Sequence, residues 1–249
     1  MKKQSLSSFH LKCICLSMMI IGEVVRQLMY QFTVGSGITP LPWQTLLYNL
    51  GYFLYLGAFP IAAFLLVEGA KKTSNQTGFL RRLFFAGIVV ELPIDIAIHG
   101  FDGFDYLGYQ QNYFFTLFLG LCVICLVEKL AKWLTAGTFF YNLITIVLYL
   151  VATVIAMLFQ MEQGGLGVLV IFALYVFYGN KLFSLISVTI LYVLFFTGVG
   201  IFAVVPALSL FLLWLYEGEE GKKTMLSRLC FYFAYPIVFV IVGVCTRFL

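Results

Sequence analysis

Two charged residues lie three positions apart inside the first apolar segment of the chain. Glu23 and Arg26 are at i and i+3, so they share one face of the expected helix. A charged side chain at bilayer depth costs about 2.5–3.5 kcal/mol on insertion scales, so it persists where it is paired, hydrated or used in chemistry. The pair is consistent with an ion pair that fixes packing, or with a polar cavity in which Arg26 binds an anion and Glu23 accepts a proton.

A second pair of charged side chains, Glu91 and Asp95, lies at i and i+4 in a later apolar segment, with Pro93 between them. Two carboxylates this close repel each other in a low-dielectric environment unless a cation lies nearby. Arg26 is the basic residue that we expect at a comparable depth. We therefore expect the first and third helices to pack together, with Arg26 near Glu91 or Asp95. The four side chains then form either a salt-bridge cluster or a catalytic site with an acid/base pair.

The composition places these charges in a membrane protein. Of the 249 residues, 62% are hydrophobic and only 10% are charged, and the mean hydropathy is +1.02. Soluble domains are about 45–50% apolar and about 25% charged. A soluble globule, a disordered chain and a nucleic-acid-binding module are therefore excluded, and no nucleic-acid partner is expected. The sequence predicts an all-α fold, a single polytopic transmembrane helical bundle over residues 1–249, with the lipid bilayer around it.

Nine apolar segments are expected to span the membrane. They are residues 11–34, 44–69, 83–99, 113–128, 139–160, 164–178, 182–199, 201–216 and 228–247. All but two of the 15 Lys and Arg residues fall on one set of alternate connections, whereas Asp102, Asp105 and Glu162 fall on the other. Under the positive-inside rule, this predicts an N-terminus inside and a C-terminus outside. We expect a multi-pass protein of a bacterial cell membrane.

Basic residues gather on the predicted cytosolic side. The candidates for binding an anionic donor are Lys71, Lys72, Arg82, Lys222, Lys223 and Arg228. These cations form either an ordinary basic inner surface or a site for the phosphates of a cytosolic donor. Glu68, beside the first two lysines, is expected to form a surface ion pair. The two histidines and six cysteines have no metal-ligand spacing, so no metal is expected.

A series of short motifs runs through nearly the whole chain. It comprises Leu11-Lys12, Ala58-Phe59-Pro60, Val67-Glu68-Gly69, Glu91-Leu92-Pro93-Ile94-Asp95, Phe115-Thr116-Leu117, the glycines Gly164, Gly165 and Gly167, Tyr216-Glu217-Gly218 and Tyr235-Pro236. In this order and spacing, the chain resembles the TraX family of membrane proteins. That family is associated with N-acetylation of conjugative pilin. The resemblance implies an acyltransferase with acetyl-CoA as donor and an amine or hydroxyl of a membrane or envelope peptide as acceptor.

Three positions depart from histidines that are typical of the family. They hold Glu23, Lys72 and Val238. Histidine is the usual group that takes a proton from an amine or hydroxyl near neutral pH. The chain is then either a diverged acyltransferase, with Glu23 as base and Arg26, Glu91 and Asp95 shaping the cavity, or a family member that lost catalysis and serves as a membrane scaffold or subunit. A transporter is a weaker third alternative, because the chain has no internal repeat.

Overall fold

The computed structural model describes residues 6–30, 39, 41–99 and 110–219, together with the helical residues 233–234, 236–238 and 240–241. This part of the chain contains helices and no β-strand. Two isolated β-bridges join Leu6 to Tyr216 and Gln111 to Met161. The described residues therefore form the all-helical fold that the sequence predicts. Three candidate donor-binding residues, Lys222, Lys223 and Arg228, lie outside them.

The helices follow the predicted apolar segments closely. In chain order they are α1 (Ser8–Tyr30), α2 (Pro42–Lys72), α3 (Gln76–His99), α4 (Tyr113–Leu130), α5 (Phe139–Leu158), α6 (Gly164–Val176), α7 (Lys181–Phe195), the 3-10 helix η2 (Thr197–Val204), α8 (Val205–Leu208) and the 3-10 helix η3 (Ser209–Leu215). Three of the α-helices begin at a polar N-cap whose side chain accepts a hydrogen bond from a backbone amide of the first turn. These N-caps are Asn112, Thr138 and Asn180.

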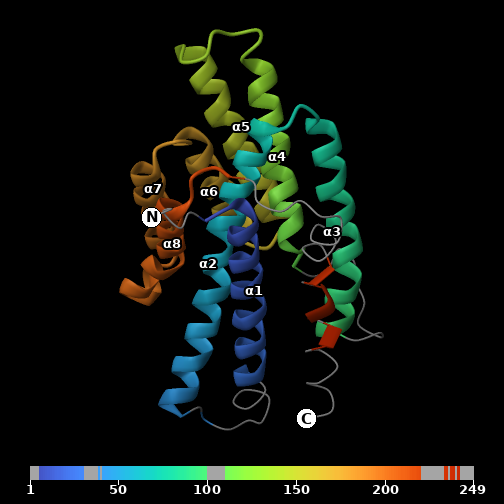
Figure 1. Cartoon of the computed structure of the whole chain (residues 1–249), viewed down its shortest axis with the longest axis vertical. Coiled ribbons are helices and arrows are strands. Elements are labelled where there is room, and N and C mark those ends of the chain that lie inside the picture. Colours follow the sequence, from blue (N-terminus) through green and yellow to red (C-terminus); the bar gives the residue numbers. More distant parts are fainter. Residues whose placement is uncertain are drawn as a thin grey trace.

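The long helix α2 organises the bundle (Figure 1). Helix α1 packs along it, and α4, α6 and α8 contact it as well. Helix α6 in turn contacts α2, α4, α5 and α7, so α2 and α6 share the core. With 31 residues, α2 is about 46 Å long. It can therefore carry functional side chains at two well-separated levels of the bundle.

Membrane-spanning character is clear in four helices. Segments within α1, α2, α4 and α5 are long and apolar enough to cross a bilayer. The helices α6 and α7 and the stretch 205–215 are apolar but shorter. Most exposed side chains on α5 and α7 are apolar, as for Leu158 at 73% and Leu194 at 64% exposure, which suits contact with lipid tails. The count of nine spans and the orientation of the termini stay predictions.

One predicted helix differs from the structure. The sequence predicts a continuous helix over residues 201–216, whereas η2, α8 and η3 occupy this stretch in succession. The break that separates it from α7 is confirmed, because α7 ends at Phe195. Gly198 and Gly200 disfavour an α-helix at the start of the stretch, and Pro206 removes a backbone donor within it. The ninth predicted span, 228–247, falls mostly outside the described residues.

Pro60 interrupts the hydrogen-bond ladder of α2. A proline has no N–H, so the carbonyl four residues earlier, that of Leu56, loses its helical donor. The fully buried hydroxyl of Tyr192 on α7 lies 3.4 Å from this carbonyl oxygen and donates to it. Nearby, the Cys15 thiol on α1 donates to the Ala58 carbonyl over 3.3 Å. Tyr192 of α7 thus supplies the donor that Pro60 removes from the Leu56 carbonyl, as a low-dielectric environment requires.

Two glycines allow α1 and α2 to touch backbone to backbone. A Cβ atom at Gly22 would lie 2.6 Å from the Tyr55 amide nitrogen and 2.7 Å from the Gly51 carbonyl oxygen. A Cβ atom at Gly51 would lie 2.9 Å from the Gly22 carbonyl oxygen and 3.0 Å from the Arg26 amide nitrogen. Small residues permit such close crossings in membrane bundles. This contact sets Glu23 and Arg26 of α1 beside Tyr55 of α2.

Candidate functional site

The predicted pair on α1 forms a bidentate ion pair. Arg26 Nη2 lies 2.6 Å from Glu23 Oε1, and Arg26 Nε lies 2.9 Å from Glu23 Oε2. Glu23 is only 1% exposed, whereas the Arg26 side chain is 30% exposed. The geometry combines a buried anion with a cation that reaches the edge of the bundle.

The expected packing of α1 against α3 is wrong. Helix α1 packs chiefly on α2, and α3 packs chiefly on α4. The reason is the Gly22–Gly51 crossing, which brings α1 closest to α2. The carboxylate partner of Arg26 comes from its own helix, and the structure gives Arg26 no ion pair with Glu91 or Asp95.

Glu91 and Asp95 are buried on α3, with exposures of 0% and 2%. Glu91 Oε2 accepts from the Asn112 backbone amide over 2.9 Å and from the Asn112 side-chain amide. The same side-chain amide donates to the Gly87 carbonyl oxygen over 2.9 Å. Glu91 Oε1 is buried and has no hydrogen-bond partner in the part of the chain that the structure describes. Glu91 therefore joins α3 to the start of α4. Its second oxygen, Oε1, could accept a hydrogen bond from a donor that enters the site.

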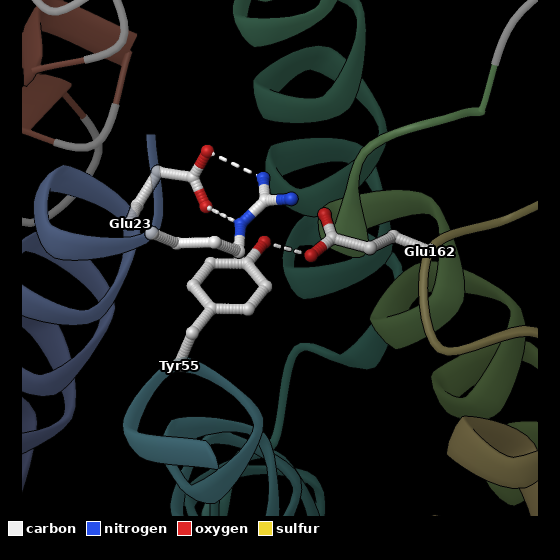
Figure 2. Close-up of polar contacts among 4 residues, drawn as sticks. Glu23, Tyr55 and Glu162 are labelled. Carbon is white, nitrogen blue, oxygen red and sulfur yellow. Dashed lines mark hydrogen bonds and ion pairs between the residues drawn. The ribbon is translucent and has the colours of Figure 1, made fainter. Parts of the chain in front are cut away.

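Glu162 is a site residue that our sequence analysis missed. The Tyr55 hydroxyl donates to Glu162 Oε1, and the Tyr113 backbone amide donates to Glu162 Oε2 over 3.0 Å. The Thr116 hydroxyl donates to the Glu162 carbonyl. Figure 2 draws the Glu23 and Glu162 carboxylates on opposite sides, with the guanidinium group that Glu23 binds between them and the Tyr55 hydroxyl directed at Glu162. We call Glu23, Arg26, Tyr55 and Glu162 the Arg26 cluster.

Unusual backbone geometry aims Glu162 into the bundle. Gln160 and Gln163, on either side of it, have φ angles of 48° and 65°. A left-handed conformation costs a non-glycine residue of order 1–3 kcal/mol and is often found at functional sites. Met161 and Gln111 hold the turn through their backbone bridge, and the Glu162 amide donates to the Gln111 carbonyl over 2.6 Å. The short connection is thus fixed from both sides.

The start of α4 is where two carboxylates meet. The Asn112 amide donates to Glu91, the Tyr113 amide donates to Glu162, and the Phe114 amide donates to the Asn112 side chain over 3.0 Å. The first amides of a helix have no partner within the helix, and the helix dipole favours negative charge there. One helix terminus therefore positions carboxylates from α3 and from the turn before α6.

A second polar group lies near the other end of α2. The Lys71 ammonium is 4.3 Å from the centre of the Tyr175 ring and 5.3 Å from that of Tyr178. Phe64 stacks on Tyr178 with ring centres 6.3 Å apart. We call Phe64, Lys71, Tyr175 and Tyr178 the Lys71 cluster.

Lys72 and Glu68 form an ion pair of 2.9 Å beside this cluster. The pair was expected at the surface, but Glu68 is only 6% exposed. The Tyr216 hydroxyl donates to Glu68 Oε2 over 2.6 Å, and Lys72 also donates to the Gly218 carbonyl over 3.0 Å. Lys181 donates to the Tyr216 carbonyl over 2.9 Å. These contacts bind the Tyr216-Glu217-Gly218 segment to the end of α2.

The Tyr216→Phe variant is expected to lose about 1.5–3 kcal/mol of stability, because a buried hydrogen bond to a charged group disappears. Unfolding of the purified protein in detergent measures the loss. Tyr149→Phe is the matched control, since the buried Tyr149 hydroxyl has no hydrogen-bond partner among the described residues. Equal stability of the two variants would contradict the assigned role of Tyr216.

The family comparison matches residues 7–246 to the family described as TraX protein. The chain belongs to the TraX family. The match covers nearly the whole chain, so the resemblance found from the motifs is confirmed. No curated protein and no solved structure matches this chain.

The three positions at which the resemblance led us to expect histidine have distinct surroundings. Glu23 is held by Arg26, and Lys72 is held by Glu68. Val238 lies in the helical residues 236–238. Among the described residues, no group of three or more His, Cys, Asp or Glu side chains could hold a metal ion.

Two more features complete the candidate site in this TraX-family chain. Arg82 on α3 is exposed, and its guanidinium carbon lies 5.8 Å from the centre of the Phe79 ring. Lys71 lies sixteen positions after Tyr55 of the Arg26 cluster in α2, about 24 Å along the helix. The Arg26 cluster and the Lys71 cluster are therefore distinct sites on one rigid element.

Proposed function

We propose that this TraX-family protein is a membrane acyltransferase that moves an acetyl group from cytosolic acetyl-CoA to an amine or hydroxyl of a membrane or envelope peptide. The observation that carries the proposal is the Arg26 cluster, a group of charged and phenolic side chains between apolar helices in a member of this family. Burying Glu23 against a partly exposed Arg26 is unfavourable unless the polar group serves packing or chemistry.

The reaction joins the acceptor to the acetyl carbonyl carbon. The acceptor nitrogen or oxygen forms a bond to this carbon, the carbon–sulfur bond breaks, and the CoA thiol leaves. The acceptor loses a proton, for which Glu23 is the predicted base. Both oxygens of Glu23 bind Arg26, so proton uptake by Glu23 would weaken the ion pair.

The Lys71 cluster is the proposed entry for the donor. Lys71 and Lys72 lie in the last turn of α2, and Arg82 lies on α3. The Lys71 ammonium contacts aromatic rings, whereas Lys72 is engaged by Glu68. We assign Lys71 and Arg82 to the phosphates of acetyl-CoA, with Lys222, Lys223 and Arg228 as further candidates.

The same proposal includes the membrane arrangement. Nine spans with the N-terminus in the cytoplasm of a bacterial cell would put the Lys71 cluster on the cytosolic side, where acetyl-CoA occurs. The Arg26 cluster would then lie farther toward the outer side, where an envelope peptide arrives. The Lys and Arg residues gather on alternate connections between the apolar segments, and this distribution supports the orientation.

Transfer of radiolabelled acetyl groups tests the proposal. Inside-out membrane vesicles that contain the full chain are supplied with labelled acetyl-CoA, and label is measured in membrane peptides. We expect incorporation above that of vesicles lacking the chain. Incorporation at the background level would contradict the proposed activity. A Glu23→Gln variant that transfers label at the wild-type rate would remove Glu23 from the role of base.

A second candidate function is a membrane scaffold or a subunit of a membrane complex. It is favoured by the structural contacts that three carboxylates already make: Glu23 with Arg26, Glu68 with Lys72 and Tyr216, and Glu91 with Asn112. In that case the charged groups hold the helices together without turnover. Stable, monodisperse protein with no label transfer would favour this function.

A further inference from the structure

Two independent features of the structure converge on Glu162. Left-handed backbone at Gln160 and Gln163 turns the connection between α5 and α6 so that Glu162 reaches α2 and α4. Its carboxylate then binds the Tyr55 hydroxyl through one oxygen and the Tyr113 amide through the other. A carboxylate that only lay on the surface of this five-residue connection would need neither the left-handed backbone nor the two donors. The arrangement instead resembles a base that orients a hydroxyl group.

Glu23 and Glu162 are engaged in different ways. Glu23 holds the guanidinium of Arg26 with both oxygens, so its charge compensates a cation. Glu162 instead accepts from the Tyr55 phenol through one oxygen and from the Tyr113 backbone amide through the other. Figure 2 shows the Tyr55 hydroxyl directed at Glu162, with the Glu23 carboxylate on the opposite side. A proton passed from Tyr55 to Glu162 would leave the Glu23–Arg26 ion pair intact.

We propose that Tyr55 and Glu162 form the proton relay of the transfer reaction, with Tyr55 touching the acceptor and Glu162 as its positioning residue. As the acceptor nitrogen or oxygen bonds to the acetyl carbon, its proton moves to the Tyr55 oxygen. The phenolic proton of Tyr55 moves to Glu162 in the same step. The carbon–sulfur bond then breaks, and Glu162 returns the proton through Tyr55 to the CoA sulfur. In this scheme Tyr55 and Glu162 replace Glu23 as the proton acceptor, and Glu23 holds Arg26 through both of its oxygens.

This inference rests on the proposed acyltransferase function. Label transfer from radiolabelled acetyl-CoA is measured in inside-out vesicles for the wild type and for Tyr55→Phe, Glu162→Gln and the double variant. A general base contributes about 10²–10⁴-fold to a rate, so each single variant is expected to lose at least about 100-fold in kcat. The KM for acetyl-CoA should stay within about twofold, because the donor phosphates bind elsewhere. The double variant should be no slower than the slower single variant, since the two residues act as a unit.

Matched substitutions separate a relay from a general loss of structure. Tyr149→Phe on α5 and Glu128→Gln near the end of α4 make the same chemical changes outside the Arg26 cluster and should retain wild-type kcat. Independent, multiplying losses in the two single variants, or wild-type kcat in either of them, would overturn the relay. An inactive wild type would refute the acyltransferase function itself, and the relay with it. A monodisperse profile in detergent confirms that each variant is folded before kcat is compared.

Discussion

The Gly22→Ala variant is expected to lose about 1–3 kcal/mol of stability or more, as overpacked cores do. The new Cβ atom would lie 2.6 Å from the Tyr55 amide nitrogen and 2.7 Å from the Gly51 carbonyl oxygen. These are backbone atoms, so no side chain can rotate away to make room. Helix α1 must therefore shift from α2, and Glu23 and Arg26 shift with it.

Thermal unfolding in detergent measures this effect, and Gly198→Ala is the matched control. A Cβ atom at Gly198 meets no atom within 4 Å, so its stability should stay within about 0.5 kcal/mol of the wild type. The label-transfer rate should also fall in Gly22→Ala, because the Arg26 cluster is assembled across the crossing. Equal unfolding temperatures for the two variants would refute the close contact of α1 with α2.

The Arg26→Met variant is expected to lose about 3–5 kcal/mol, because it leaves the buried Glu23 carboxylate without its cation. Glu23 is 1% exposed and has little access to water that could replace the guanidinium. The 30% exposure of the Arg26 side chain places the expected loss toward the lower end of the range. Chemical unfolding in detergent, with the wild type beside it, measures the difference.

A double-variant cycle isolates the ion pair. Glu23→Gln combined with Arg26→Met removes both charges, so it should regain a large part of the stability that Arg26→Met loses. A double variant that is less stable by the sum of both single losses would show that the two side chains act independently. The bidentate geometry would then contribute nothing to stability.

Much of the helical order could be predicted from the sequence. Apolar segments and their polar breaks locate α1 to α7. The spacing of Glu23 and Arg26 places them on one helix face, where they form the ion pair that was one of the two alternatives. The motif order predicts the family, which the match over residues 7–246 confirms. These features depend on local spacing along one helix or on the chain order of short motifs.

The pairing of helices could not be predicted in the same way. The expected contact between α1 and α3 fails because two glycines, Gly22 and Gly51, decide which backbone α1 can approach. Glu162 was missed because its role depends on left-handed backbone at Gln160 and Gln163 and on a tyrosine 107 positions earlier. The signal that could have identified Glu162 is its position as a lone carboxylate just before Gly164-Gly165-Leu166-Gly167.

The proposed acetyl transfer requires that this TraX-family protein binds acetyl-CoA, with Lys71 and Arg82 as the proposed contacts to its phosphates. Calorimetric titration in detergent tests this binding without knowledge of the acceptor. We predict micromolar binding of acetyl-CoA and of free CoA by the wild type. Lys71→Gln and Arg82→Gln should each weaken the affinity about tenfold, as expected for one charge-assisted contact, while Lys132→Gln should not. A folded, monodisperse wild type that binds no acetyl-CoA at millimolar concentration would contradict the account.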